Sequence, residues 1–493
     1  FLISTWQSGW QNYANIVDPP VDNSRMKQII SFLLVWQLIA VCSCSKTAAP
    51  DPPPSGDTTV HVNGITIEPA EFVLLPGLSQ QLTVHVTPAN AGNKNVTWSC
   101  SDNSVATVSS DGLVTAVKEG STDVTATSTD NSSVKYSAKL HVLRNYELYI
   151  AGNGATDYFA NCALFWKNGT PSTLTGGGFL VGWSAYAITL VGDDVYIAGS
   201  IVNTRLWDIP TYWKNNVPHV LADTNASTDT YTRSIAVVNN KVYVAGYTFY
   251  DSECPVYCNG RNRAFYWVDD GTAVSATALF DESASTNAYG IACNGSDIVV
   301  AGATAHDQYF RWANLWTNTF TNTASLSPLN GFYEARAVQL HGADTWFTGY
   351  GGCPDYGCNA TAFVWKNDMG NATALTDGTR DAQAYCMAFS GDVLYVGGYE
   401  RNDAGKYVAK YWKISGGSVS SCTLSDGTYN EVVNGIAVSG DDVFLVGTAT
   451  NPDTRARKAK CWRSYQGFST AQSLDISAYA VPGGHDAYGI FIK

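Results

Sequence analysis

Short apolar runs alternate with polar positions over most of the chain, and turn residues separate the runs. Between residues 58 and 143 the alternation has a period of two, as in Leu82-Thr83-Val84-His85-Val86 and Val105-Ala106-Thr107-Val108. Turn signals lie between such runs at Pro76-Gly77 and Asp111-Gly112. Because successive side chains of a β-strand point to opposite faces, this pattern predicts several short strands, each with one buried face. We therefore expect a small β-sandwich over residues 58–143.

The pattern of residues 144–493 repeats itself. A strand-like run that ends in glycine recurs seven times, at Gly152, Gly199, Gly246, Gly302, Gly349, Gly398 and Gly447, with steps of 47, 47, 56, 47, 49 and 49 residues. A tryptophan follows each glycine, at Trp166, Trp213, Trp267, Trp316, Trp365, Trp412 and Trp462. Self-similarity at this period is typical of propellers and other repeat architectures. A ring of equivalent tryptophans is expected to pack between repeats rather than to bind a ligand.

Each repeat contains four candidate strands. An apolar run such as Ala187-Ile188-Thr189-Leu190 precedes a tight turn, and Val195-Tyr196-Ile197-Ala198-Gly199 follows it. Thr211-Tyr212-Trp213-Lys214-Asn215 is a third run, and a short run such as Ser172-Thr173-Leu174 is a fourth. The first repeat lacks its opening run, and Ala487-Tyr488-Gly489-Ile490-Phe491-Ile492 matches the missing one. The sequence therefore predicts an all-β protein whose seven-bladed β-propeller is closed by the C-terminal strand.

The segment 26–44 has the form of a leader. It starts at a methionine, contains the apolar run Ile29–Val41 and ends in Val41-Cys42-Ser43-Cys44. A run of this length suits a signal peptide and is too short to span a membrane comfortably. The ending resembles a bacterial lipobox, and this resemblance implies a lipoprotein signal peptide with lipidation at Cys44. Cys42 is a second candidate, and an ordinary signal peptide without lipidation is the other alternative.

The segments on either side of this leader predict little structure. Residues 1–25 precede it without structural logic, so we interpret them as a start-site artefact. Residues 45–57 contain Pro50-Asp51-Pro52-Pro53-Pro54 and are expected to form a stiff linker. The leader implies a location in the cell envelope, lipid-anchored to the outer membrane and either periplasmic or surface-exposed, with the lipid as the only membrane contact. Disulfides persist in that compartment.

Residues 58–143 carry several motifs besides their alternation. They include Ile67-Glu68-Pro69, Val96-Thr97-Trp98-Ser99, Asp111-Gly112-Leu113-Val114-Thr115-Ala116 and Val124-Thr125-Ala126-Thr127. The segment resembles the group 2 bacterial immunoglobulin-like domain over nearly its whole length. That resemblance implies a stalk or adhesion module at a cell surface, although a plain spacer is the alternative. Trp98 is expected to anchor the core between two sheets.

Residues 144–493 resemble seven-bladed propellers in general, with a repeat close to the kelch length. The double glycine of kelch repeats and the Gly-His and Trp-Asp signatures of the other large propeller family do not recur from repeat to repeat. The resemblance therefore implies an architecture and no functional family.

Composition and the search for fingerprints narrow the possible functions. The formal charge of -13 argues against a nucleic-acid partner, because binding to a phosphate backbone requires a basic surface. The sequence contains no HExxH, GxSxG, P-loop or dinucleotide fingerprint. No cofactor or metal is expected, and we expect a monomer.

One position in each repeat combines chemistry with a shared place in the fold. It directly precedes the small residue of the opening run, and around the ring it is Tyr186, Arg233, Tyr289, Arg336, Tyr385, Asn434 and Tyr488. The small residues that follow are Ala187, Ser234, Gly290, Ala337, Cys386, Gly435 and Gly489. Strict alternation places each pair on opposite strand faces, and the small residues would let neighbouring blades approach closely. The seven larger residues are expected to share a face with the loops after the repeat glycines.

Two of those loops contain paired cysteines. Cys254 and Cys258 lie in one, and Cys353 and Cys358 lie in the other in a matching context. We expect a short disulfide within each loop. A metal site is the alternative, but it would require further ligands, and no histidine lies beside either pair.

Aromatic, arginine and amide groups around a central depression suit sugar rings or a loop of a protein partner. The sequence thus favours a non-catalytic envelope lipoprotein that binds a glycan or a cell-surface protein through the loop face. One alternative is a polysaccharide-active enzyme that uses the carboxylates of Glu334 and Asp486. Another is a structural scaffold of an envelope complex. In a third alternative, the tyrosines and arginines bond to each other and only plug the channel.

Overall fold

The structure of the protein is a computed structural model. It describes residues 59–493 apart from 155–161, 177–179, 223–227, 251–260, 280–283, 306–310, 318–331, 353–358, 466–471 and 476–483. The predicted artefact, leader and linker, both lipidation candidates and both cysteine pairs lie outside the described residues. Every regular element in the described ranges is a β-strand, as the pattern predicts. Among these residues no helix of sufficient length and apolar character to cross a membrane is found.

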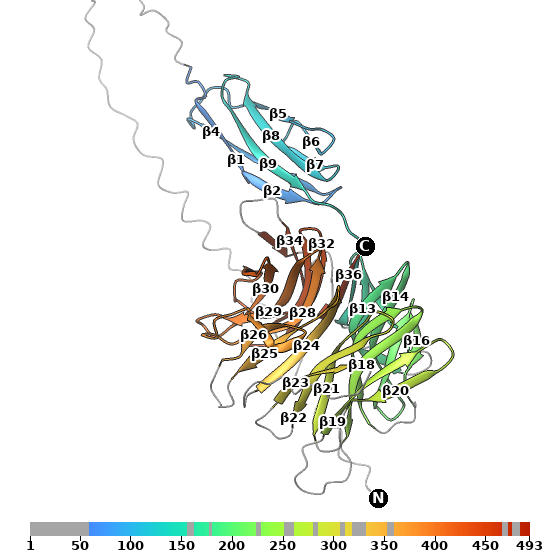
Figure 1. The fold of residues 1–493 in the computed structure, drawn as a ribbon. Coiled ribbons are helices and arrows are strands. Elements are labelled where there is room, and N and C mark those ends of the chain that lie inside the picture. Colours follow the sequence, from blue (N-terminus) through green and yellow to red (C-terminus); the bar gives the residue numbers. More distant parts are fainter. Residues whose placement is uncertain are drawn as a thin grey trace, which may run out of the picture. The chain divides into compact units, whose positions relative to one another are not determined.

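Nine short strands form the segment drawn in blue to blue-green in Figure 1. They are β1 (Gly64–Glu68), β2 (Glu71–Leu74), β3 (Ser79–Gln81), β4 (Thr83–Thr87), β5 (Val96–Cys100), β6 (Ala106–Val108), β7 (Leu113–Ala116), β8 (Gly120–Ser128) and β9 (Lys135–Val142). The sheets have the strand orders β1-β4, β2-β9-β8-β5 and β3-β7-β6. Alternate apolar residues of these strands share one core, which includes Ile67, Val114, Val124 and Leu140. The alternating apolar residues of the sequence therefore form the buried faces of these sheets.

Trp98 differs in detail from its predicted role. It is half-buried and packs at the edge of this core. A Cβ atom at Gly112 would lie 2.7 Å from its ring, so the indole covers the turn. Gly112 has a φ of 85° and its N–H donates to the carbonyl of Ser109 over 3.1 Å, which confirms the tight turn.

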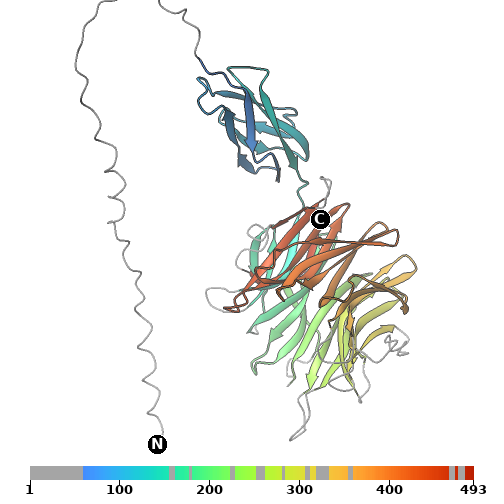
Figure 2. The ribbon, with the colours of Figure 1, turned by 90° about the vertical axis from the view of Figure 1, so that its left-hand side faces the viewer.

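The remaining strands form sheets that run from green to red in Figures 1 and 2. The first sheet has the order β12 (Thr170–Thr173), β11 (Cys162–Lys167), β10 (Leu148–Gly154) and β36 (Gly484–Ile492). The next two contain β13 (Leu180–Val191), β14 (Asp194–Val202), β15 (Asp208–Lys214) and β16 (Val217–Val220), then β17 (Thr230–Val238), β18 (Lys241–Tyr250), β19 (Arg261–Asp269) and β20 (Val274–Ala278). No sheet in the described part of the chain joins these strands to β1–β9.

A seven-stranded sheet follows. It consists of β21 (Ser285–Cys293), β22 (Ile298–Ala305), β23 (Arg311–Thr317), β24 (Phe332–His341), β25 (Asp344–Gly352), β26 (Thr361–Lys366) and β27 (Asp368–Ala374). A single parallel bridge, Arg311 to Phe332, joins β23 to β24, so the sheet divides into a group of three and a group of four antiparallel strands. The last two sheets contain β28 (Ala382–Ser390), β29 (Val393–Arg401), β30 (Tyr407–Ser415) and β31 (Ser418–Thr423), then β32 (Asn430–Ser439), β33 (Asp442–Thr450), β34 (Arg457–Tyr465) and β35 (Gln472–Asp475).

The opening strands of these groups contact one another in sequence. In order they are β36, β13, β17, β21, β24, β28 and β32, and β32 in turn contacts β36. The C-terminal strand β36 pairs antiparallel with β10, so it supplies the run that the first repeat lacks. We call these seven the innermost strands.

The recurring glycine of each second strand has a steric cause. A Cβ atom at Gly152, Gly199, Gly246, Gly302, Gly349, Gly398 or Gly447 would lie between 1.8 and 2.1 Å from a carbonyl oxygen of the innermost strand beside it. In each group the register shifts at this point, because the innermost strand has a β-bulge there. Only glycine allows the bulged strand to come so close.

The recurring tryptophans are buried between neighbouring sheets, as the sequence predicts. Their exposed fractions lie between 0% and 6%. Trp166 of β11 packs against Phe444 and Val446 of β33, and Trp462 of β34 packs against residues of β29 and β30. Close approach of the innermost strands is also confirmed, since a Cβ atom at Gly489 would lie 2.9 Å from the backbone nitrogen of Ile188.

Candidate functional site

The seven residues singled out in the sequence meet around one cavity. This cavity has a volume of about 600 Å³, and all seven innermost strands contribute to its lining. We call the seven residues the collar: Tyr186, Arg233, Tyr289, Arg336, Tyr385, Asn434 and Tyr488. Each of them lines the cavity and is half-buried. A volume of this size lies within the range of small-molecule sites.

Strict alternation, which predicts opposite strand faces for each collar residue and the small residue after it, is wrong at this point of the strands. Tyr186 and Ala187 both line the cavity, and so do Arg233 and Ser234. The register shows the reason, because Ala185 pairs with Gly199 and Ala187 pairs with Ala198, leaving Tyr186 as the extra residue of a bulge. All seven collar residues occupy this extra position. A bulge re-aims its extra side chain, and here it directs each collar residue toward the cavity.

Arg233 lies within a cluster of tyrosine rings. Its Cζ atom is 4.3 Å from the ring centroid of Tyr186 and 5.3 Å from that of Tyr247, both within cation–π range. Its Nη2 donates to the hydroxyl oxygen of Tyr247 over 2.6 Å. Its Nε is buried and has no hydrogen-bond partner. The guanidinium is thus held in place mainly by rings, with donor capacity left over.

Arg336 has matching surroundings. Its Cζ atom is 4.2 Å from the ring centroid of Tyr289, and its Nη2 donates to the hydroxyl of Tyr350 over 3.0 Å. In addition, Nη2 lies 2.5 Å from Oε2 of Glu334, which also accepts from the Tyr350 hydroxyl over 2.9 Å. Burial opposes the guanidinium charge, but the Glu334 carboxylate together with the Tyr289 and Tyr350 side chains outweighs burial, and the pKa of Arg336 is raised. Arg336 still exposes 26% of its side chain.

Other members of the collar also have hydrogen bonds and ring contacts. The side-chain amide of Asn434 donates to the carbonyl of Ala487 over 3.0 Å, which links β32 to β36. The rings of Tyr186 and Tyr488 lie 5.2 Å apart. The Tyr385 hydroxyl donates to Oε1 of Gln383 over 2.6 Å. Burial raises the pKa of Tyr385 to about 12 and that of Tyr488 to about 12, so both phenols are neutral at physiological pH.

The two carboxylates of the enzyme alternative are already engaged elsewhere. Glu334 is fully buried in its ion pair with Arg336. Asp486 is 2% exposed, accepts from the Thr448 hydroxyl over 2.8 Å and lies 2.6 Å from Nη2 of Arg457. Neither residue lines the cavity, and their strands β24 and β36 are not neighbours among the innermost strands. The geometry does not present them as a pair to a bound saccharide.

Sequence reasoning missed the tyrosines that fix the arginines. Tyr247 and Tyr350 each follow a repeat glycine directly. The hydroxyl oxygen of Tyr247 accepts a hydrogen bond from Arg233, and that of Tyr350 accepts one from Arg336. Tyr399 occupies the same position after Gly398, and its ring lies 6.0 Å from that of Tyr385. The sequence did contain a signal for these tyrosines, because the residue directly after the constant repeat glycine differs from one repeat to the next. These contacts place the collar beside the parts of β18, β25 and β29 that directly follow the repeat glycines.

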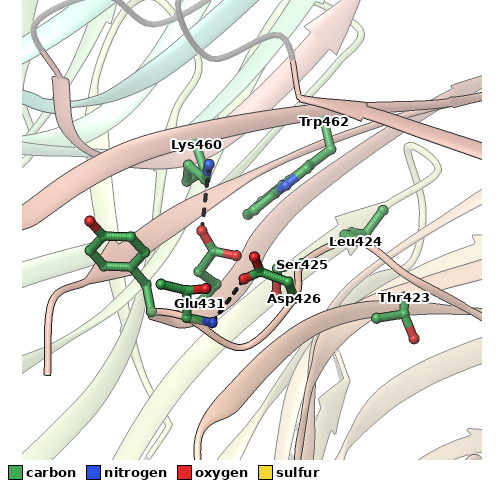
Figure 3. Close-up of a pocket in the computed structure, with 9 residues that line it drawn as sticks. Thr423, Leu424, Ser425, Asp426, Glu431, Lys460 and Trp462 are labelled. Atoms are coloured by element: carbon green, nitrogen blue, oxygen red, sulfur yellow. Dashed lines mark hydrogen bonds and ion pairs between the residues drawn. The ribbon is translucent and has the colours of Figure 1, made fainter. Parts of the chain in front are cut away.

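A second cavity lies between β31, β32 and β34 (Figure 3). Its volume is about 510 Å³. Lys460 points toward Glu431, with Trp462 beside them, and the Nζ and Oε1 atoms lie 3.5 Å apart. Asp426 accepts from the backbone N–H of Thr428 over 2.8 Å. The charged groups of this cavity already have partners within the protein, so fewer of them can bind a ligand than at the collar.

Comparison with known proteins identifies the first domain. Residues 61–138 match the family described as Bacterial Ig-like domain (group 2). An uncharacterized protein of Clostridium acetobutylicum is 34% identical over 119 residues, which is 24% of this chain and 12% of that protein. An alpha-L-arabinofuranosidase of Bifidobacterium longum subsp. longum is 47% identical over 70 residues, which is 14% of this chain and 7% of the enzyme. The chain thus spans about a tenth of the length of these relatives.

Solved structures show weaker likeness. The β-propeller domain of the Trilobed protease from Pyrococcus furiosus aligns with 74% of this chain and 95% of its own, at 13% identity and a TM-score of 0.38. The structure of YjhT aligns with 60% of this chain and 98% of its own, at 11% identity and a TM-score of 0.38. Scores of this size carry no functional argument.

Proposed function

We propose that residues 144–493 form a seven-bladed β-propeller that binds a glycan in the cavity of the collar, without catalysis. Seven innermost strands in cyclic contact, with β36 completing the first sheet, support the number of blades and the closure of the ring. The match of residues 61–138 supports an immunoglobulin-like sandwich over residues 58–143, acting as a stalk or spacer.

The observation that carries the binding function is the common placement of the collar. Seven bulges direct seven half-buried side chains into one cavity of about 600 Å³. Bulges are enriched beside binding and active sites because they re-aim single side chains. Tyrosine rings offer flat apolar surface, and arginine and amide groups offer hydrogen bonds to hydroxyls, so the lining suits a sugar of one or a few rings.

The plug alternative is partly supported, since Arg233 and Arg336 do bond to tyrosines. These bonds leave the Nε atoms of both arginines without a partner, however, and leave the cavity unfilled. This favours a preorganised binding site over a plug.

Besides the alpha-L-arabinofuranosidase, a 3-O-alpha-D-galactosyl-alpha-L-arabinofuranosidase of Bifidobacterium longum subsp. longum is 34% identical over 98 residues, and these two names fit a glycan-related role. Because this chain spans only 7% and 9% of those enzymes, their activity is not transferred to it. The engagement of Glu334 and Asp486 in internal ion pairs supports binding rather than hydrolysis. Cys44 lipidation would hold the protein, as a monomer, at the outer membrane.

A glycan array probed with the purified chain from Thr47 onward tests the proposal. Array hits are then measured by calorimetry with the wild type, with Tyr289→Ala and with a control, Val217→Ala, whose side chain is exposed on β16. Tyr289→Ala should weaken binding while Val217→Ala leaves it unchanged. An array without hits, or a hit that binds both variants equally well, would contradict glycan binding at the collar. A protein captured from surface extracts instead would favour the protein-partner or scaffold alternative.

A further inference from the structure

Two members of the collar form a natural internal comparison. Arg233 and Arg336 lie on β17 and β24, with β21 between them among the innermost strands. Both are the extra residue of a bulge, both lie over a tyrosine ring and both donate to a tyrosine that follows a repeat glycine. In both, Nε is buried without a hydrogen-bond partner. Because the backbone geometry is the same at both arginines, a difference in ligand binding between them is attributed to the charged groups around each guanidinium.

The difference lies two residues upstream on the same strand. At Arg336 that position is Glu334, whose carboxylate is 2.5 Å from the guanidinium. At Arg233 it is Tyr231, whose ring centroid is 5.7 Å from Cζ. None of the ion pairs found in the described ranges involves Arg233. The acidic group that it influences is Asp208, whose Oδ1 accepts instead from the Ser200 hydroxyl over 2.6 Å.

These contacts set the charge of the cavity lining. The Arg336 charge is balanced by a buried carboxylate of the protein, whereas the Arg233 charge has no ion-pair partner among the described residues. A guanidinium is charged at any physiological pH, so it cannot relieve burial by losing its proton. An uncompensated cation in a confined, ring-lined cavity attracts an anion more strongly than it would at a solvated surface. Among the collar residues, Arg233 is therefore expected to give an anionic ligand the largest gain in binding free energy.

We propose that the ligand of the collar is an acidic saccharide and that Arg233 binds its carboxylate from the cavity. This inference rests on the glycan-binding function proposed above. A guanidinium fork matches the two oxygens of a carboxylate, and the nearby tyrosine rings receive the apolar face of the sugar. Uronic acids are saccharides of this chemistry. Arg336, already paired with Glu334, contributes to the wall of the site and not to its preference for acids.

The test is an array printed with matched pairs, in which each uronic-acid oligosaccharide stands beside its carboxyl-reduced form and a sulfated oligosaccharide of equal length. The acidic member of a bound pair should bind the wild type about 10- to 100-fold more tightly, as a charge-assisted hydrogen bond predicts. Arg233→Gln should remove this preference. Tyr231→Glu should do the same without changing a residue that lines the cavity, because it gives Arg233 the acidic neighbour that Arg336 has. Thermal unfolding of each variant checks that it is folded.

The outcomes separate the two proposals. Equal binding of acidic and carboxyl-reduced forms would overturn the acid preference and leave glycan binding intact. Stronger binding of the sulfated form would overturn the assignment of a carboxylate. A preference that survives in both Arg233→Gln and Tyr231→Glu would show that another group reads the acid. If neither form binds, glycan binding itself fails and the inference fails with it.

Discussion

The steric fit of the repeat glycine beside the bulge leads to a quantitative prediction for β25, which carries three glycines near one another. A Cβ atom added at Gly349 would lie 1.8 Å from the carbonyl oxygen of Glu334, whereas Cβ atoms are essentially never found within 3.0 Å of another heavy atom. That oxygen belongs to the backbone of a bulge and cannot move without disturbing the pairing of β24 with β25. We expect Gly349→Ala to lower the free energy of unfolding by about 3 kcal/mol, the upper end of the cost of overpacking.

The same strand supplies graded controls. At Gly351 the added Cβ would meet the Tyr333 ring at 2.0 Å, a side chain that can turn, so Gly351→Ala should cost about 1 to 2 kcal/mol. At Gly352 the closest atom lies at 3.2 Å, and Gly352→Ala should change stability by about 0.5 kcal/mol or less. Replacing glycine by alanine also restricts the unfolded chain, but this effect is common to all three variants and cancels in the comparison.

Equilibrium unfolding in urea, followed by tryptophan fluorescence, measures these differences. Eleven of the 15 tryptophans lie in residues 144–493, so the signal reports mainly on the propeller. If Gly349→Ala and Gly352→Ala proved equally stable, the steric account of the repeat glycine would be refuted. Loss of glycan binding in Gly349→Ala at a concentration of urea where it stays folded would further show that the bulge positions the collar.

Three other predictions follow from contacts of the described residues. Glu334→Gln leaves the Arg336 guanidinium without its ion-pair partner and should lower the free energy of unfolding by about 3 kcal/mol in the same urea assay. The control Asp403→Asn removes an exposed ion pair with Arg380 and should change the free energy of unfolding by less than about 0.5 kcal/mol. Deleting β36 removes the partner strand of β10 and should abolish cooperative thermal unfolding of the propeller, as seen by circular dichroism; an unchanged transition would contradict closure by this strand. Burial raises the pKa of Tyr385 and Tyr488 to about 12 from an ordinary value near 10. Because the folded state holds these protons more tightly than the unfolded state, the contribution of the two tyrosines to stability is fully present below about pH 10. This contribution is lost as the pH rises through about 12. A phenolate absorbance whose titration shows a midpoint near pH 10 for every tyrosine would contradict this burial.

Much of the fold follows from the sequence because its signals are periodic and local. Alternation in residues 58–143 and the glycine and tryptophan spacing in residues 144–493 each require only that a strand bury one face. The match of β36 to the missing first run was visible for the same reason, since repeats must supply equivalent strands. The shared position of the collar was also visible, because equivalent residues of a repeat occupy equivalent places.

What the side chains at that position do was decided by the tertiary structure. Strict alternation failed at Tyr186 because a bulge inserts one residue, and a bulge depends on the partner strand and on the glycine opposite. Glu334 looked like a candidate catalytic acid in the sequence, yet its distance from Arg336 makes it a buried counter-ion. Glu334 and Arg336 lie two residues apart on β24, but the distance between their side chains depends on the folded structure, which the order of residues does not give. The sequence alone thus determined where the collar lies, and packing decided that Arg336 and not Arg233 has an ion-pair partner within the described part of the chain.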